Sequence, residues 1–145
     1  MNRCLRLCYQ RQLIYAGLDD FNPNGVFSKY MGGEGGARSA EWQQAVVTFL
    51  DQGVDCGVLT VTNWDDIFSS EEPIDIEGAL LGSCIHEKFH SDRDIVWNAL
   101  YFYGTKALVE ELNRFCLNSW EAMNFPEDID FLRAVKKKFN MDFSL

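Results

Sequence analysis

The sequence lacks a long apolar run, a paired set of cysteines and a recognisable secretion signal. No apolar stretch approaches the roughly 20 residues that cross a bilayer as a helix, so no membrane-spanning segment is expected. Residues 1–17 mix basic and apolar side chains, whereas a signal peptide keeps its basic residues ahead of an uninterrupted apolar stretch. The five cysteines are odd in number and contain no C-x-x-C pair, which argues against disulfides or a zinc knot and predicts reduced thiols in a cytoplasmic protein.

Basic residues are also scarce. The chain has 13 lysines and arginines against 22 acidic residues, which gives a formal net charge of −9. Such a charge argues against binding to nucleic acids and anionic membranes, because both are bound through basic patches. It predicts a basic protein as the partner, although the solubility of an ordinary cytoplasmic protein explains the same charge.

Length and apolar content indicate a folded domain. The 145 residues are enough for a single domain, 1–145, which buries about two-thirds of the surface that its unfolded chain exposes. Apolar residues make up 47% of the chain and aromatic residues 14%, which predicts a packed core rather than disorder.

The spacing of apolar residues predicts a predominantly helical α+β domain with a small sheet at most. Ser39 is a suitable N-cap for the helix that follows it, and Pro126 suits a first helical turn. The stretch 94–104 is rich in aromatic and β-branched residues but does not alternate strictly, so strand and helix both stay open. Helices are expected over 3–17, 25–31, 40–52, 76–89 and 105–120 and from Pro126 onward, and a strand over 56–62.

The two histidines of the chain, His86 and His90, lie in the stretch HEKFH. On a helix, histidines four residues apart share a face and can bind zinc, while Glu87 activates water, as in the zinc peptidases whose core this stretch resembles. Lys88 inside the motif, the charged residues after it and the lack of a third histidine favour a solvated helix end. A small zinc-dependent hydrolase, with His86 and His90 as ligands and Glu87 as base, is kept as the alternative.

A second near match is a calcium-binding loop. The position of the bidentate glutamate, which supplies two ligand oxygens, is occupied by Met31, and no second loop exists to pair with this one. We therefore expect a turn without metal. The other positions of an EF-hand loop are matched by Asp20, Asn22, Asn24, Gly25 and Ser28.

The segment 63–77 combines acidic and large apolar side chains without a basic residue. Aromatic anchors among carboxylates suit docking on a basic protein surface, because charge steers the encounter and the aromatic rings supply buried area. A solvated loop explains the carboxylates as well, and this reading stays open. The residues predicted to bind a partner are Trp64, Asp65, Asp66, Phe68, Glu71, Glu72 and Asp75.

A small, acidic chain with such a segment resembles the immunity proteins of bacterial contact-dependent growth inhibition and related polymorphic toxin systems. Size, charge and residues 64–77 carry the resemblance. It implies a cytoplasmic, non-catalytic protein without a cofactor that binds a cognate toxin domain, often a basic nuclease, and blocks its active site. Acidic chaperones and scaffolding domains share the same profile and stay open as a further alternative.

Overall fold

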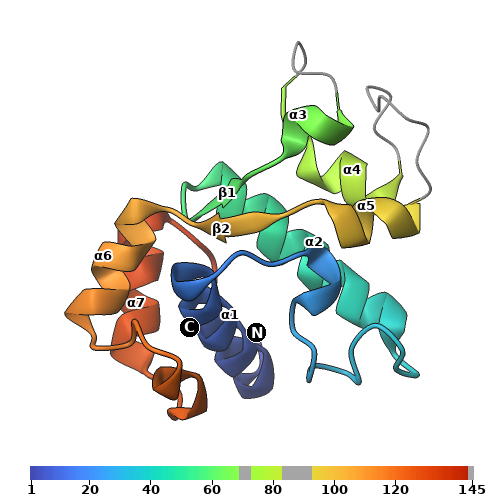
Figure 1. Ribbon diagram of the computed structural model, residues 1–145. Helices are drawn as coiled ribbons and strands as arrows, with labels where there is room; N and C mark the ends of the chain where they lie inside the picture. The colour runs from blue at the N-terminus through green and yellow to red at the C-terminus, as the bar shows by residue number, and fades with distance from the viewer. Residues whose placement is uncertain (69–72, 83–92, 144–145) are drawn as a thin grey trace.

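The computed structural model of the protein describes residues 1–68, 73–82 and 93–143. In these ranges it contains seven α-helices and one small antiparallel sheet of two strands (Figure 1), which confirms the predominantly helical α+β class. No helix in the described part of the chain is long and apolar enough to cross a membrane. The elements are α1 (Arg3–Leu18), η1 (Pro23–Gly25), α2 (Ser39–Asp55), β1 (Leu59–Val61), α3 (Trp64–Ile67), α4 (Ile76–Leu81), α5 (Arg93–Ala99), β2 (Phe102–Gly104), α6 (Lys106–Arg114), η2 (Glu121–Asn124) and α7 (Ile129–Phe139).

The two long helices, α1 and α2, form where the apolar spacing predicts them. The side chain of Asn2 caps α1 by accepting a hydrogen bond from the backbone nitrogen of Leu5 at 2.9 Å. The predicted N-cap of α2 is wrong by one position, because Ser39 is the first helical residue and Arg38 precedes it without a side-chain capping bond. Arg38 instead pairs with Glu41 in the first turn of α2.

The ambiguous stretch 94–104 divides into a helix and a strand. It lies mostly in α5 and ends in β2, so both alternatives are right for part of the sequence. β2 pairs antiparallel with β1, with Leu59 opposite Gly104 and Val61 opposite Phe102. Phe21 adds one further bridge to Phe102, which attaches the chain after α1 to the sheet.

The other predicted helices are shorter than expected. Gly25 belongs to η1 and residues 26–31 form turns and a bend. α4 ends at Leu81, and its C-cap Gly82 adopts the left-handed conformation typical of a helix end, while 83–89 of the predicted helix lie outside the described residues. α6 ends at Arg114, and Asp128 caps α7 by accepting from Phe131. Pro126 therefore precedes α7 instead of lying in its first turn.

Tyr9 lies where four parts of the chain meet in the core. Its side chain is 1% exposed, and its ring packs against Phe27, Phe49 of α2 and Phe143, with centroid distances of 5.1, 5.0 and 5.6 Å. Burial raises the pKa of the Tyr9 hydroxyl. The neighbouring residue on α1, Gln10, is fully buried and holds the segment before α7. Its amide donates to the Pro126 carbonyl at 2.9 Å and accepts from the Asp128 nitrogen at 2.7 Å.

Candidate functional site

The negative charge of the protein comes from one part of the chain. Residues 39–87, here called the acidic segment, contain ten acidic residues and no lysine or arginine. The rest of the chain holds the other 12 acids and all 13 bases, a net charge of +1. The described part of the acidic segment comprises α2, β1, α3 and α4, which follow one another from cyan to yellow-green in Figure 1.

Helices α3 and α4 lie with α5 at one end of the molecule, at the upper right of Figure 1. Asn63 fixes α3 there, because its amide donates to the Ala99 carbonyl at 2.7 Å and accepts from the Tyr101 nitrogen at 2.9 Å. α4 is attached to α5 through the indole of Trp97, which donates to the Leu80 carbonyl at 2.8 Å. Two short helices that have little stability of their own are thus held by long-range hydrogen bonds.

The predicted carboxylates are exposed where the structure describes them. Asp65 and Asp66 lie on α3, and Asp75 lies just before α4. Asp75 also has a structural role, because it caps α4 by accepting from the Gly78 nitrogen at 2.9 Å. Glu71 and Glu72 lie outside the described residues, so their predicted role stays a prediction.

The aromatic part of the predicted site differs from the structure. Trp64 is 6% exposed and Phe68 is 1% exposed, and their rings stack on each other with a centroid distance of 4.2 Å. The two side chains belong to the core and do not form exposed anchors. Their spacing could have indicated this, because Trp64, Ile67 and Phe68 recur at i, i+3 and i+4 and share a helix face.

Aliphatic side chains are exposed among the carboxylates instead. Ile74 is 49% exposed just before Asp75, and Leu81 is 43% exposed at the end of α4. Ile95 is 55% exposed on the adjacent α5. Sequence reasoning did not single out these residues, since an isolated isoleucine or leucine carries no signal of exposure. They supply the apolar area that Trp64 and Phe68 were expected to provide.

Acids of α2 extend the site beyond the predicted segment 63–77. Asp51 of α2 and Glu77 of α4 line the same hollow of about 210 Å³. The carboxylates of Asp51 and Glu77 therefore face a common hollow. Carboxylates in this position can accept charge-assisted hydrogen bonds from lysine or arginine side chains.

Of the two near matches to metal motifs, the structure describes only the one that resembles a calcium loop. His86, Glu87 and His90 lie outside the described ranges, so the zinc hydrolase stays a hypothesis from sequence. In the near match to a calcium loop, Asn22 accepts from the Gly25 nitrogen at 3.0 Å and Asn24 donates to Asn98 at 2.7 Å. These amides stabilise a turn. Within 1–68, 73–82 and 93–143, no three His, Cys, Asp or Glu residues gather as a metal site.

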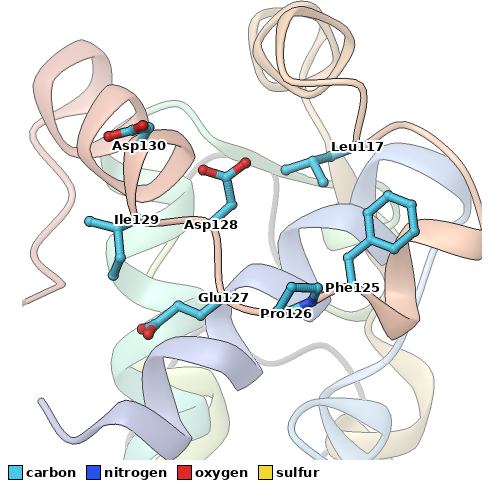
Figure 2. A pocket seen from close by; sticks show the side chains of 7 residues that line it. All are labelled: Leu117, Phe125, Pro126, Glu127, Asp128, Ile129 and Asp130. Atoms are coloured by element: carbon cyan, nitrogen blue, oxygen red, sulfur yellow. The ribbon is translucent and has the colours of Figure 1, made fainter.

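A pocket of about 420 Å³ lies beside the start of α7 and is lined by three carboxylates (Figure 2). Two of them have structural partners, because Glu127 accepts from Arg6 at 2.6 Å and Asp128 caps α7. Figure 2 shows the Glu127 carboxylate directed away from Asp128 and Asp130, so the three groups do not converge on a common ligand position. This pocket therefore carries no functional assignment.

Comparisons with protein-family models, with curated proteins and with solved structures gave no match.

Proposed function

We propose that the chain is a non-catalytic binding protein that docks its acidic segment on a basic protein domain. The observation that carries the proposal is the concentration of charge: ten acids and no base lie in one segment, whereas the remainder of the chain is nearly neutral. A field of one sign over one region accelerates association with a partner of opposite charge and orients it.

The exposed aliphatic residues complete the docking surface. Charge complementarity contributes mainly to the rate and specificity of association, while affinity requires apolar side chains that become buried. Ile74, just before Asp75, and Leu81, the last residue of α4, provide such exposed side chains. An interface with an apolar centre and a charged rim follows from this arrangement.

The partner that best fits this surface is a toxin domain of the basic, nuclease type, which the protein neutralises in the bacterial cytoplasm. Support comes from the resemblance to immunity proteins and from the acidic segment. Its carboxylates carry negative charge, as do the phosphates that the cleft of a nuclease binds. A toxin-bearing gene immediately upstream would identify the cognate partner. An acidic scaffold or chaperone would bind the same partner without blocking its activity.

The test is isothermal titration of the neighbouring gene's toxin domain with wild-type protein and with Asp65→Lys/Asp66→Lys. We expect a one-to-one complex that weakens as salt is raised, and a loss of affinity of roughly 100-fold in the variant, about tenfold for each reversed charge. The matched control, Asp19→Lys/Asp20→Lys, reverses two neighbouring exposed aspartates outside the acidic segment and should change affinity far less.

Two outcomes would contradict the proposal. One is undiminished binding of Asp65→Lys/Asp66→Lys at high salt. The other is an equal loss in both double variants, which would show that net charge alone, and not the acidic segment, determines affinity. A toxin assay on the same complexes separates neutralisation from scaffolding.

A further inference from the structure

A second pocket, of about 330 Å³, lies between α1, the turns after η1 and the η2 region. Its lining contains two cations, Arg11 and Lys29, and no carboxylate. That composition is unexpected in a chain in which acids outnumber bases 22 to 13. The pocket shares no residue with the acidic segment, and its volume lies within the range of small-molecule sites.

Both cations lack an acidic partner in the part of the chain that the structure describes. The Nε atom of Arg11 is buried and has no hydrogen-bond partner. Neither Arg11 nor Lys29 forms a salt bridge with a described residue, whereas most other described arginines and lysines do. Lys29 is exposed and Arg11 is partly buried. An anion in the pocket would give both cations the charged partner that they lack among the described residues.

Gln12 supplies a third donor at the same pocket. It is 7% exposed, and its amide oxygen accepts from the Phe27 nitrogen at 3.4 Å. This bond fixes the orientation of the amide, since the opposite side must carry the nitrogen. No described residue accepts a hydrogen bond from that nitrogen, so a nine-tenths buried donor is left for a ligand.

The wall around these donors is held in place by the core. Phe27 adopts φ of 52°, a left-handed conformation that is unusual for a bulky residue and persists only where its surroundings hold it. The backbone nitrogen of Phe27 donates to the Gln12 amide oxygen, and the backbone carbonyl of Phe27 accepts from the indole of Trp42 at 3.2 Å. The cations and the amide therefore face a preformed wall.

The remaining lining adds apolar surface and no negative charge. Burial, followed by the influence of Cys4, raises the pKa of the Cys8 thiol to about 11, so the thiol stays protonated at neutral pH. Tyr15 lines the pocket, and its ring packs edge-on against Trp120, which lies outside the pocket lining, at 5.3 Å between centroids. A planar organic group could rest against this aromatic rim.

We propose that this pocket binds a small phosphate monoester, with the phosphate between Arg11, Lys29 and the Gln12 amide. A phosphate monoester is close to a dianion at pH 7, which matches two cations, whereas a carboxylate or sulfate ester would neutralise only one. The planar guanidinium of arginine can donate two parallel hydrogen bonds to phosphate oxygens. The aromatic rim takes the organic part. This assignment is independent of the proposed docking function.

The test is titration calorimetry and amide-shift NMR of the full chain, prepared without phosphate, with phenyl phosphate as the probe. We expect shifts of the backbone amides around residues 8, 12 and 27–29. Phenyl sulfate has nearly the same shape and one negative charge less, and it should bind about tenfold more weakly. Inorganic phosphate, which leaves the aromatic rim empty, should also bind more weakly than phenyl phosphate.

The variants Arg11→Gln and Lys29→Gln should each weaken phenyl phosphate binding by about tenfold or more. Lys137→Gln, on the exposed side of α7, removes the same charge elsewhere and should leave affinity within about twofold. Because Lys29 is exposed, its variant tests the site even where Arg11→Gln unfolds the protein, which circular dichroism would reveal.

Any of four results would overturn the assignment: no binding of phenyl phosphate, equal affinity for phenyl sulfate, equal affinity for inorganic phosphate, or an equal loss in Lys29→Gln and Lys137→Gln.

Discussion

Trp42 and Trp64 are both buried indoles, but their N–H groups are in opposite situations. The Trp42 nitrogen donates to the Val26 carbonyl at 2.9 Å and to the Phe27 carbonyl at 3.2 Å. The Trp64 nitrogen is buried and has no hydrogen-bond partner in the described part of the chain. A buried polar group without a partner loses its bonds to water and gains none in return.

The two tryptophans therefore provide a matched pair of substitutions. Trp42→Phe removes a donor to the Val26 carbonyl, whereas the Phe27 carbonyl still accepts from the Tyr30 nitrogen at 2.9 Å. Trp64→Phe removes a donor that has no acceptor among the described residues. We expect Trp42→Phe to lower the free energy of unfolding by about 1–3 kcal/mol more than Trp64→Phe does. Urea denaturation followed by circular dichroism measures the difference. Equal losses would show that ring volume, and not hydrogen bonding, determines both effects.

At the level of the elements, the close approach of β2 to α1 depends on Gly104. A β-carbon at this position would lie 2.8 Å from the Ala16 carbonyl oxygen and 3.0 Å from a methyl group of Leu108. The Ala16 oxygen belongs to the backbone of α1 and cannot move without shifting the helix. The packing of β2 against α1 therefore requires a residue without a β-carbon at position 104.

We expect Gly104→Ala to destabilise the protein by about 1–3 kcal/mol, which is typical of overpacking. The control is Gly35→Ala, because a β-carbon at Gly35 would have no atom within 4 Å. That change should be neutral or should stabilise by up to about 1 kcal/mol, since alanine restricts the unfolded chain. Thermal unfolding compares the two variants. A Gly104→Ala protein as stable as Gly35→Ala would mean that α1 and β2 can separate without cost.

Local patterns in the sequence located the helices but not all of their ends. The apolar face of α2 was predictable because Trp42, Val46 and Phe49 recur at helical spacing and all three are buried. The division of 94–104 into α5 and β2 was not predictable, because β2 exists only through its pairing with β1, more than 40 residues away. α6 ends at Arg114, short of the predicted range 105–120, and Cys116 two residues later adopts a φ of 57°.

The candidate site was predictable in its charge and not in its apolar contacts. The exposed carboxylates Asp65, Asp66 and Asp75 follow from composition alone. Whether an aromatic ring beside these carboxylates points outward depends on which residues cover it. The ring of Trp64 stacks on Phe68 and is buried in the core. The pocket with Arg11 and Lys29 joins residues that are 18 positions apart through turns that no local pattern specifies.

At the scale of the whole molecule, charge is distributed asymmetrically between two parts of one chain. The acidic segment carries ten acids without a base, while the remainder carries a net charge of +1 and contains the pocket with two cations. The electrostatic behaviour of such a chain depends on where a charge lies and not only on how many charges there are.

Anion-exchange chromatography tests this asymmetry without any partner. Asp65→Asn/Asp66→Asn and Asp19→Asn/Asp20→Asn each remove two negative charges from neighbouring exposed aspartates. Their net charges are identical, but we expect the first variant to elute at a lower salt concentration, because it weakens the side that contacts the resin. Elution of both variants at the same salt concentration would contradict a dominant acidic side.

The contacts of Tyr9 and Gln10 have a consequence for the order in which the protein forms during synthesis. Both residues are synthesised well before their partners, because Gln10 bonds to Pro126 and Asp128, and Tyr9 packs against Phe143. At translation rates of about 5–20 residues per second, these partners follow after a delay on the order of ten seconds. During that interval the nascent chain keeps the buried face of α1 open to water and to other molecules. Helix α1 is therefore enclosed only after residues 126–143 have been synthesised.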